Sequence, residues 1–108
     1  MSTYTPDAWV LLEITVDKDP PIYKILAGWY GGFINGDHWR LNSGITSVID
    51  RGNYWEVHGY SSSIYVCYKT SERFSGLTQY IFNSFKKKAS ENVVINHIEM
   101  SNDINFGE

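Results

Sequence analysis

Cysteine and proline are both scarce in this sequence. Cys67 is its one cysteine, and three of its 108 residues are proline. A disulfide within the chain is therefore excluded, so the fold must hold together without a covalent cross-link. Because disulfide-free chains are the norm in reducing compartments, we expect a cytoplasmic protein.

Long apolar runs are also missing. No stretch reaches the roughly 20 apolar residues that a membrane-spanning helix needs, so we expect no insertion into a membrane. Residues 1–7 have neither the basic start nor the apolar run of a signal peptide, so we expect no export by that route.

A large excess of charge of either sign is absent as well. Twelve acidic residues oppose nine basic ones, which gives a net charge of −3 and a pI near 5.5. Binding to a phosphate backbone requires a basic surface, so we expect no nucleic-acid partner. The glycines match neither a phosphate-binding loop nor the Gly-x-Gly-x-x-Gly fingerprint between a strand and a helix, and no cofactor is assigned.

Aromatic residues, by contrast, are abundant. They make up 16% of the chain and include eight tyrosines and four tryptophans, a composition that favours β-structure over a helical bundle. A chain of 108 residues is long enough to bury one core and too short for two separate ones. We therefore expect residues 1–108 to form a single domain.

Alternation of apolar and polar residues predicts most of the secondary structure. In the first such segment Val10, Leu12 and Ile14 fall on one side. The turn-forming sequences Asn35-Gly36 and Asp50-Arg51-Gly52 are typical of hairpins. The predicted strands are 9–16, 22–29, 38–42, 45–49, 53–60, 64–69 and 93–100. The fourth to sixth of these should form a meander.

The apolar spacing becomes helical after Ser75, which predicts a helix over 75–89. Ser75 is the expected N-cap, and the run Lys86-Lys87-Lys88 complements the helix dipole in the last turn. The expected buried stripe consists of Leu77, Tyr80, Ile81, Ser84, Phe85 and Lys88.

Together these elements predict an α+β fold. We expect a bent antiparallel β-sheet of about five to seven strands, partly closed as a barrel or sandwich, with the helix near residues 75–89 packed against one open face. Residues 1–7 and 101–108 carry no strong pattern of either kind, so we expect loosely ordered ends.

The segment 28–44 combines glycines and large aromatics more densely than the rest of the chain. One hypothesis is that its aromatics stack on a planar or sugar-like ligand while its polar side chains form directional hydrogen bonds. The candidate residues are Trp29, Tyr30, Phe33, Asn35, Asp37, His38, Trp39 and Arg40. The alternative is that these aromatics are core residues joined by turns, which is the more common arrangement because large aromatics are mostly buried.

The strand 53–60 offers a second candidate surface. Trp55 and Val57 share one face of it, which is the expected core face. The opposite face combines polar and aromatic side chains, namely Tyr54, Glu56, His58 and Tyr60.

No residues are assigned to catalysis or to a metal. His38, His58 and His97 fall on different predicted strands and lack the short spacing of a zinc or iron motif. Cys67 and His58 could form a nucleophile–base pair across a hairpin, but a buried structural cysteine is far more common. The carboxylates show no pairing that would suit acid–base chemistry.

The sequence therefore favours a small non-catalytic binding or accessory module, such as a protein-interaction or inhibitor protein of a bacterial or phage type. The alternative is a pocket protein that binds a small planar ligand or a sugar through aromatic side chains. A small hydrolase or transferase with dispersed residues is a third hypothesis. A homodimer through a sheet edge is also open, with strand 93–100 as the candidate edge.

Overall fold

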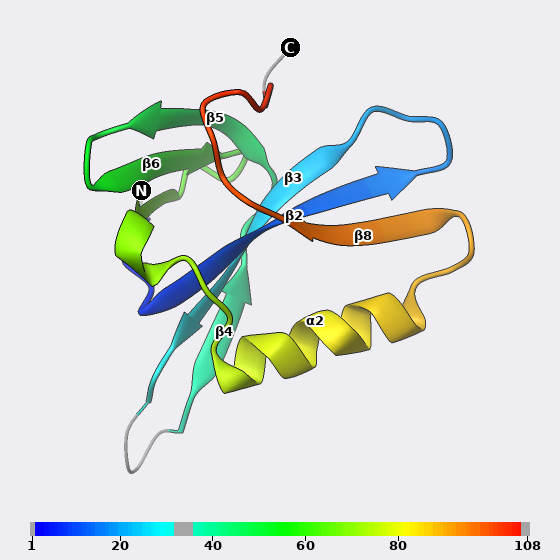
Figure 1. Ribbon diagram of the computed structural model, residues 1–108, viewed down its shortest axis with the longest axis horizontal. Helices are drawn as coiled ribbons and strands as arrows, with labels where there is room; N and C mark the ends of the chain where they lie inside the picture. The colour runs from blue at the N-terminus through cyan, green and yellow to red at the C-terminus, as the bar shows by residue number, and fades with distance from the viewer. Residues whose placement is uncertain (1, 32–35, 107–108) are drawn as a thin grey trace.

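The computed structural model describes residues 2–31 and 36–106. Within them the chain forms two four-stranded sheets and one α-helix, which confirms the predicted α+β class with a single helix (Figure 1). A short 3₁₀ turn, Lys69–Ser71, precedes the helix. The eight strands exceed the expected range by one, because the N-terminal arm contributes a short strand of its own.

One sheet, which we name the meander sheet, has the strand order β1-β7-β6-β5. Its strands are β1 (Thr3–Tyr4), β5 (Ile45–Asp50), β6 (Tyr54–Gly59) and β7 (Ile64–Tyr68). The strands β5, β6 and β7 are antiparallel neighbours, as the alternating pattern predicts. Only β1 departs from this pattern, because it pairs parallel with β7.

The other sheet, which we name the central sheet, has the strand order β4-β3-β2-β8. Its strands are β2 (Ala8–Val16), β3 (Ile22–Trp29), β4 (His38–Leu41) and β8 (Val93–Ile98). All neighbours in this sheet are antiparallel. Asn35 of the expected Asn35-Gly36 turn lies outside the described residues, and the strands on either side of it pair as a hairpin requires.

The central sheet lies between the helix and the meander sheet. Figure 1 shows helix α2 (Gly76–Lys88) and the β5–β6 hairpin on opposite sides of it. On β2, Val10 and Leu12 pack toward the helix, while Trp9 and Leu11 belong to the core that the two sheets share. The strand β2 is therefore buried on both faces, which explains why its sequence is almost continuously apolar.

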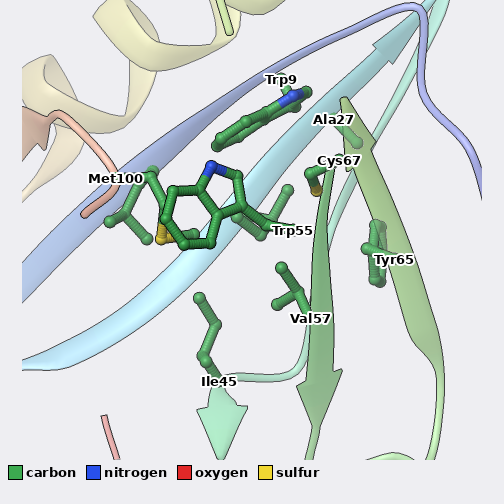
Figure 2. Packing of buried hydrophobic residues seen from close by; sticks show 10 residues of the cluster. Trp9, Ala27, Ile45, Trp55, Val57, Tyr65, Cys67 and Met100 are labelled. Carbon is green, nitrogen blue, oxygen red and sulfur yellow. The ribbon is translucent and has the colours of Figure 1, made fainter. Parts of the chain in front are cut away.

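The core between the two sheets is built around two tryptophans. Figure 2 shows Trp9 and Trp55 close together, with Met100 beside Trp55. The indole Nε1–H of Trp9 donates to the carbonyl oxygen of Tyr68 at 2.8 Å, so the polar atom of this buried ring is satisfied. Cys67 belongs to the same core, where burial raises the pKa of its thiol well above the usual range.

Helix α2 confirms the predicted helix and its N-cap. The Ser75 hydroxyl accepts from the Thr78 backbone N–H, and the Thr78 hydroxyl accepts from the Ser75 N–H, which completes a capping box. The expected stripe is confirmed in part, since Ile81 and Phe85 pack against the core below the helix. Thr78 and Phe82, however, are the buried residues, and Tyr80 is 67% exposed. The capping pair packs against the central sheet and so sets which side of the helix faces inward.

Side chains from both terminal segments pack against the rest of the protein. The Tyr4 ring packs against Trp29 and Tyr65, with ring centroids 6.2 Å and 5.1 Å away. In the C-terminal segment, Ile104 and Phe106 pack against the core between the sheets. Apolar and aromatic side chains in otherwise polar segments account for this packing, whereas residues 107–108 lie outside the described part of the chain.

Candidate functional site

The described part of the glycine-aromatic segment forms the β3–β4 hairpin. In its register Trp29 lies opposite His38, Gly28 opposite Trp39, and Ala27 opposite Arg40. Because neighbouring residues of a strand point to opposite faces, Trp29, His38 and Arg40 share the face that looks toward the meander sheet. The Trp39 ring points to the other face, where it meets the ring of Phe85 on α2 at 5.8 Å.

A hollow of about 360 Å³, which we name the aromatic cleft, opens beside this hairpin. It is lined by Tyr4, Trp29, His38, Trp39 and Arg40. The rings of Trp29 and His38 are stacked, with centroids 5.5 Å apart and an interplanar angle of 12°. The Trp29 Nε1–H donates to the Thr5 carbonyl at 3.1 Å, which fixes the indole in this position.

Arg40 supplies the positive charge of the aromatic cleft. Its guanidinium lies 4.5 Å from the centroid of the Tyr4 ring, within the range of a cation–π interaction. Burial raises the pKa of the neighbouring Tyr65 hydroxyl, and Arg40 offsets part of that rise. In the ranges 2–31 and 36–106, no carboxylate forms an ion pair with Arg40 or His38. The cleft therefore has a cationic group without an anionic partner among the described residues.

The turn residues of the segment have a different role. Asp37 accepts a hydrogen bond from the Gly31 N–H at 3.2 Å, and Asp7 accepts one from the Tyr30 N–H at 2.9 Å. These carboxylates hold the hairpin end in place, while the Tyr30 side chain is exposed beside it. Phe33 and Asn35 lie outside the described residues.

One cleft residue is not among those predicted from the sequence. Tyr4 comes from the N-terminal arm, for which the sequence predicts loose order. It reaches the cleft because β1 pairs parallel with β7, where Tyr4 lies opposite Tyr65. An isolated aromatic in a polar arm is the only available signal, and it does not say where the arm docks.

The second candidate surface is the outer face of the meander sheet. Glu56 lies at its centre, with its Oε2 2.6 Å from His58 Nε2 and its Oε1 2.9 Å from Arg51 Nε. The hydrogen bond with His58, and then that with Arg51, lower the pKa of the Glu56 carboxyl. The Glu56 carboxylate therefore already has two charged or polar partners, whereas Arg40 has no ion-pair partner among the described residues. Arg40 is for this reason the more available of the two charged groups for a ligand.

Tyr60 does not join this outer face. The strand β6 ends at Gly59, and Tyr60, with 74% of its surface exposed, turns away. It instead lines a second hollow, of about 600 Å³. The other residues around this hollow are Pro20, Pro21, Tyr23, Thr46, Asn105 and Phe106. The second hollow is larger than the aromatic cleft, and none of the described residues that line it has a charged side chain.

The described residues offer no cluster of side chains for binding a metal. No group of three or more His, Cys, Asp and Glu side chains in this part of the chain could hold a metal ion. Cys67 and His58 lie on opposite faces of the meander sheet, so they do not form a nucleophile–base pair. Glu72 is partly buried, which raises the pKa of its carboxyl, and it accepts a structural hydrogen bond from the Met100 N–H at 2.9 Å.

No helix in the two described ranges is long and apolar enough to cross a bilayer. In comparisons with known proteins, no family model, curated protein or solved structure matched this chain. Any functional inference therefore depends on the chemistry of the site.

Proposed function

We propose that this protein is a non-catalytic binding module, of accessory or inhibitor type, whose aromatic cleft holds an acidic segment of a partner protein. The observation that supports this most directly is Arg40. Its guanidinium rests on the Tyr4 ring beside the Trp29–His38 stack, and it has no ion-pair partner among the described residues. An arginine held in this way can form two parallel hydrogen bonds with a carboxylate.

The size of the aromatic cleft suits one or two side chains. Its volume of about 360 Å³ is near the lower end of the range of small-molecule sites, which is about 300–1,000 Å³. A partner carboxylate at Arg40 would place a neighbouring apolar or planar side chain against Tyr4 and Trp29. Contacts of this kind, an arginine flanked by aromatics, carry much of the energy in protein–protein interfaces.

The alternative is a pocket protein for a small planar ligand or a sugar. The second hollow supports it, because Tyr23, Tyr60 and Phe106 provide aromatic surfaces around a larger volume, about 600 Å³. The two hypotheses make different use of charge. Binding in the second hollow would not depend on Arg40, whereas binding of an acidic segment in the aromatic cleft would.

The compartment remains part of the proposal. A single cysteine, buried in the core and with the pKa of its thiol raised, suits a reducing environment. We therefore keep the cytoplasm as the proposed location.

Selection of peptides from a random display library against the folded protein tests the proposal. We expect enriched peptides to contain Asp or Glu beside an aromatic or apolar residue. Arg40→Gln should weaken their binding by about tenfold or more, and change the free energy of unfolding by less than about 1 kcal/mol. Lys18→Gln makes the same change of charge on an exposed loop, and should leave binding unchanged.

NMR titration with a selected peptide locates the contact. We expect shifts of the Trp29 indole N–H and of the backbone amides of His38 and Arg40. Peptides that bind Arg40→Gln and the native protein equally, or that shift Tyr23 and Tyr60 instead, would contradict the proposed use of the aromatic cleft. Shifts around Tyr23 and Tyr60 would favour the second hollow.

A further inference from the structure

The four sheet edges differ in how they are protected against pairing with another chain. The strand β1 has two residues, β4 has four and carries Arg40, and β5 has an irregular register between Ile45 and Ser47. These features are the usual ways of blocking an edge. The strand β8 has none of them, since Val93-Val94-Ile95-Asn96-His97-Ile98 contains no Lys, Arg, Asp, Glu, Pro or Gly.

The free main-chain groups of β8 follow from its pairing with β2. The Asp17 N–H donates to the Asn92 carbonyl at 2.8 Å, just beyond the last residue pair of that ladder, Val16 and Val93. Main-chain groups of an antiparallel strand point alternately to its two neighbours. Val94, Asn96 and Ile98 therefore bond toward β2, whereas the groups of Ile95 and His97 point away from the sheet.

We propose that β8 pairs antiparallel with β8 of a second copy of this chain, about a two-fold axis at Asn96. In this register Ile95 of each copy lies opposite His97 of the other, and their outward N–H and carbonyl groups form reciprocal hydrogen bonds. Val94, which is 52% exposed, lies opposite Ile98. The two central sheets then join as one continuous sheet of eight strands.

Charge selects this register over the one with its axis at Ile95. A two-fold axis at Ile95 would also keep the same faces together, but it would place Glu99 of each copy opposite Glu91 of the other, and like charges opposite each other destabilise a pair. With the axis at Asn96, Glu99 lies opposite Val93. Val93 and Lys88 line the same shallow groove at the end of α2, so Glu99 meets a cation there.

Variants at the axis test the proposal, because a residue on a two-fold axis lies opposite the same residue of the second chain. Asn96 is exposed, so Asn96→Asp and Asn96→Lys should fold normally, and circular dichroism would check this. Each should raise the dissociation constant of the dimer about tenfold or more, because two like charges then face each other. Mixing the two variants should restore dimers that contain one copy of each. Asn83→Asp and Asn83→Lys, on the exposed side of α2, are the matched controls and should have no effect.

Sedimentation equilibrium from micromolar to about 1 mM protein gives the dissociation constants. A native protein that stays monomeric over this range would overturn the proposal, and so would a dimer that is insensitive to both Asn96 variants.

A cross-linking variant provides a second, independent measurement. Opposite residues at a non-hydrogen-bonded position have Cα atoms about 4.5 Å apart, which is within disulfide range. Asn96→Cys should therefore give a covalent dimer with oxidised glutathione, while Asn83→Cys should not. Failure of Asn96→Cys to cross-link would contradict the register.

Discussion

Gly28 lies directly beneath the first turn of α2. A Cβ atom at this position would be 2.8 Å from Thr78 Cγ2 and 2.9 Å from Ser75 Oγ. Both neighbours are buried, at 1% and 4% exposure, and both belong to the capping box. Gly28→Ala must therefore displace the start of the helix or strain the cap.

The cost of Gly28→Ala can be worked from these contacts. Overpacking of a core costs about 1–3 kcal/mol, and a weakened N-cap adds up to about 1 kcal/mol. Replacing glycine inside a strand returns about 0.5–1 kcal/mol. We expect a net loss of about 2 kcal/mol in the free energy of unfolding, measured by urea denaturation with tryptophan fluorescence.

A matched glycine and a second-site variant provide the controls. Gly76 lies at the start of the same helix, and a Cβ atom at this position would have no atom within 4 Å, so Gly76→Ala should stabilise by about 0.5 kcal/mol. Thr78→Ser removes the methyl group that the new Cβ meets. It should therefore recover at least about 0.5 kcal/mol of the Gly28→Ala loss. A Gly28→Ala protein as stable as the native one would refute the close packing of helix and strand.

Two further predictions concern the core and its charged margin. Phe82→Ala should destabilise by about 3–5 kcal/mol while the exposed Lys87→Ala changes stability by less than about 0.5 kcal/mol, and equal urea midpoints would contradict the helix packing. A hydrogen bond from Lys69, and then one from the Gly52 N–H, lower the pKa of Asp50 to about 2. The stability that this carboxylate provides is therefore present above its unfolded pKa and is lost as the pH falls from about 4 through about 2. Acid titration of stability should be less steep for Asp50→Asn, and identical curves would count against this network.

Local patterns in the sequence are sufficient to predict the strands and the helix, because alternation and helical spacing reflect burial over a few neighbouring residues. They miss part of the buried side of α2. Thr78 reads as a polar residue in the sequence, yet it is buried because its hydroxyl completes the cap and its methyl packs beside Gly28.

In the candidate site, too, local patterns predict the residues of one hairpin but not those that come from distant parts of the chain. Alternation along one hairpin brings Trp29, His38 and Arg40 to a single face, so these residues can be predicted as a group. Tyr4 cannot, because it reaches them through pairing with β7, some sixty positions along the chain. Alternation along β6 predicts that Tyr60 lies on the outer face of the meander sheet. The strand ends at Gly59, however, and Tyr60 lines the second hollow instead.

The strand β8 lies far from its partner β2 along the chain, and this separation has a consequence for how the protein folds during synthesis. Its ladder pairs Leu11–Val16 of β2 with Val93–Ile98, so this edge of β2 stays open while the segment between the two strands is synthesised. At about 5–20 residues per second, this wait is on the order of 5–20 s. During this wait Leu11 and Leu12, which are fully buried in the finished protein, lie on the part of β2 whose second edge is still unpaired. The nascent chain should therefore be most prone to aggregation, and most dependent on chaperones, just before β8 emerges from the ribosome.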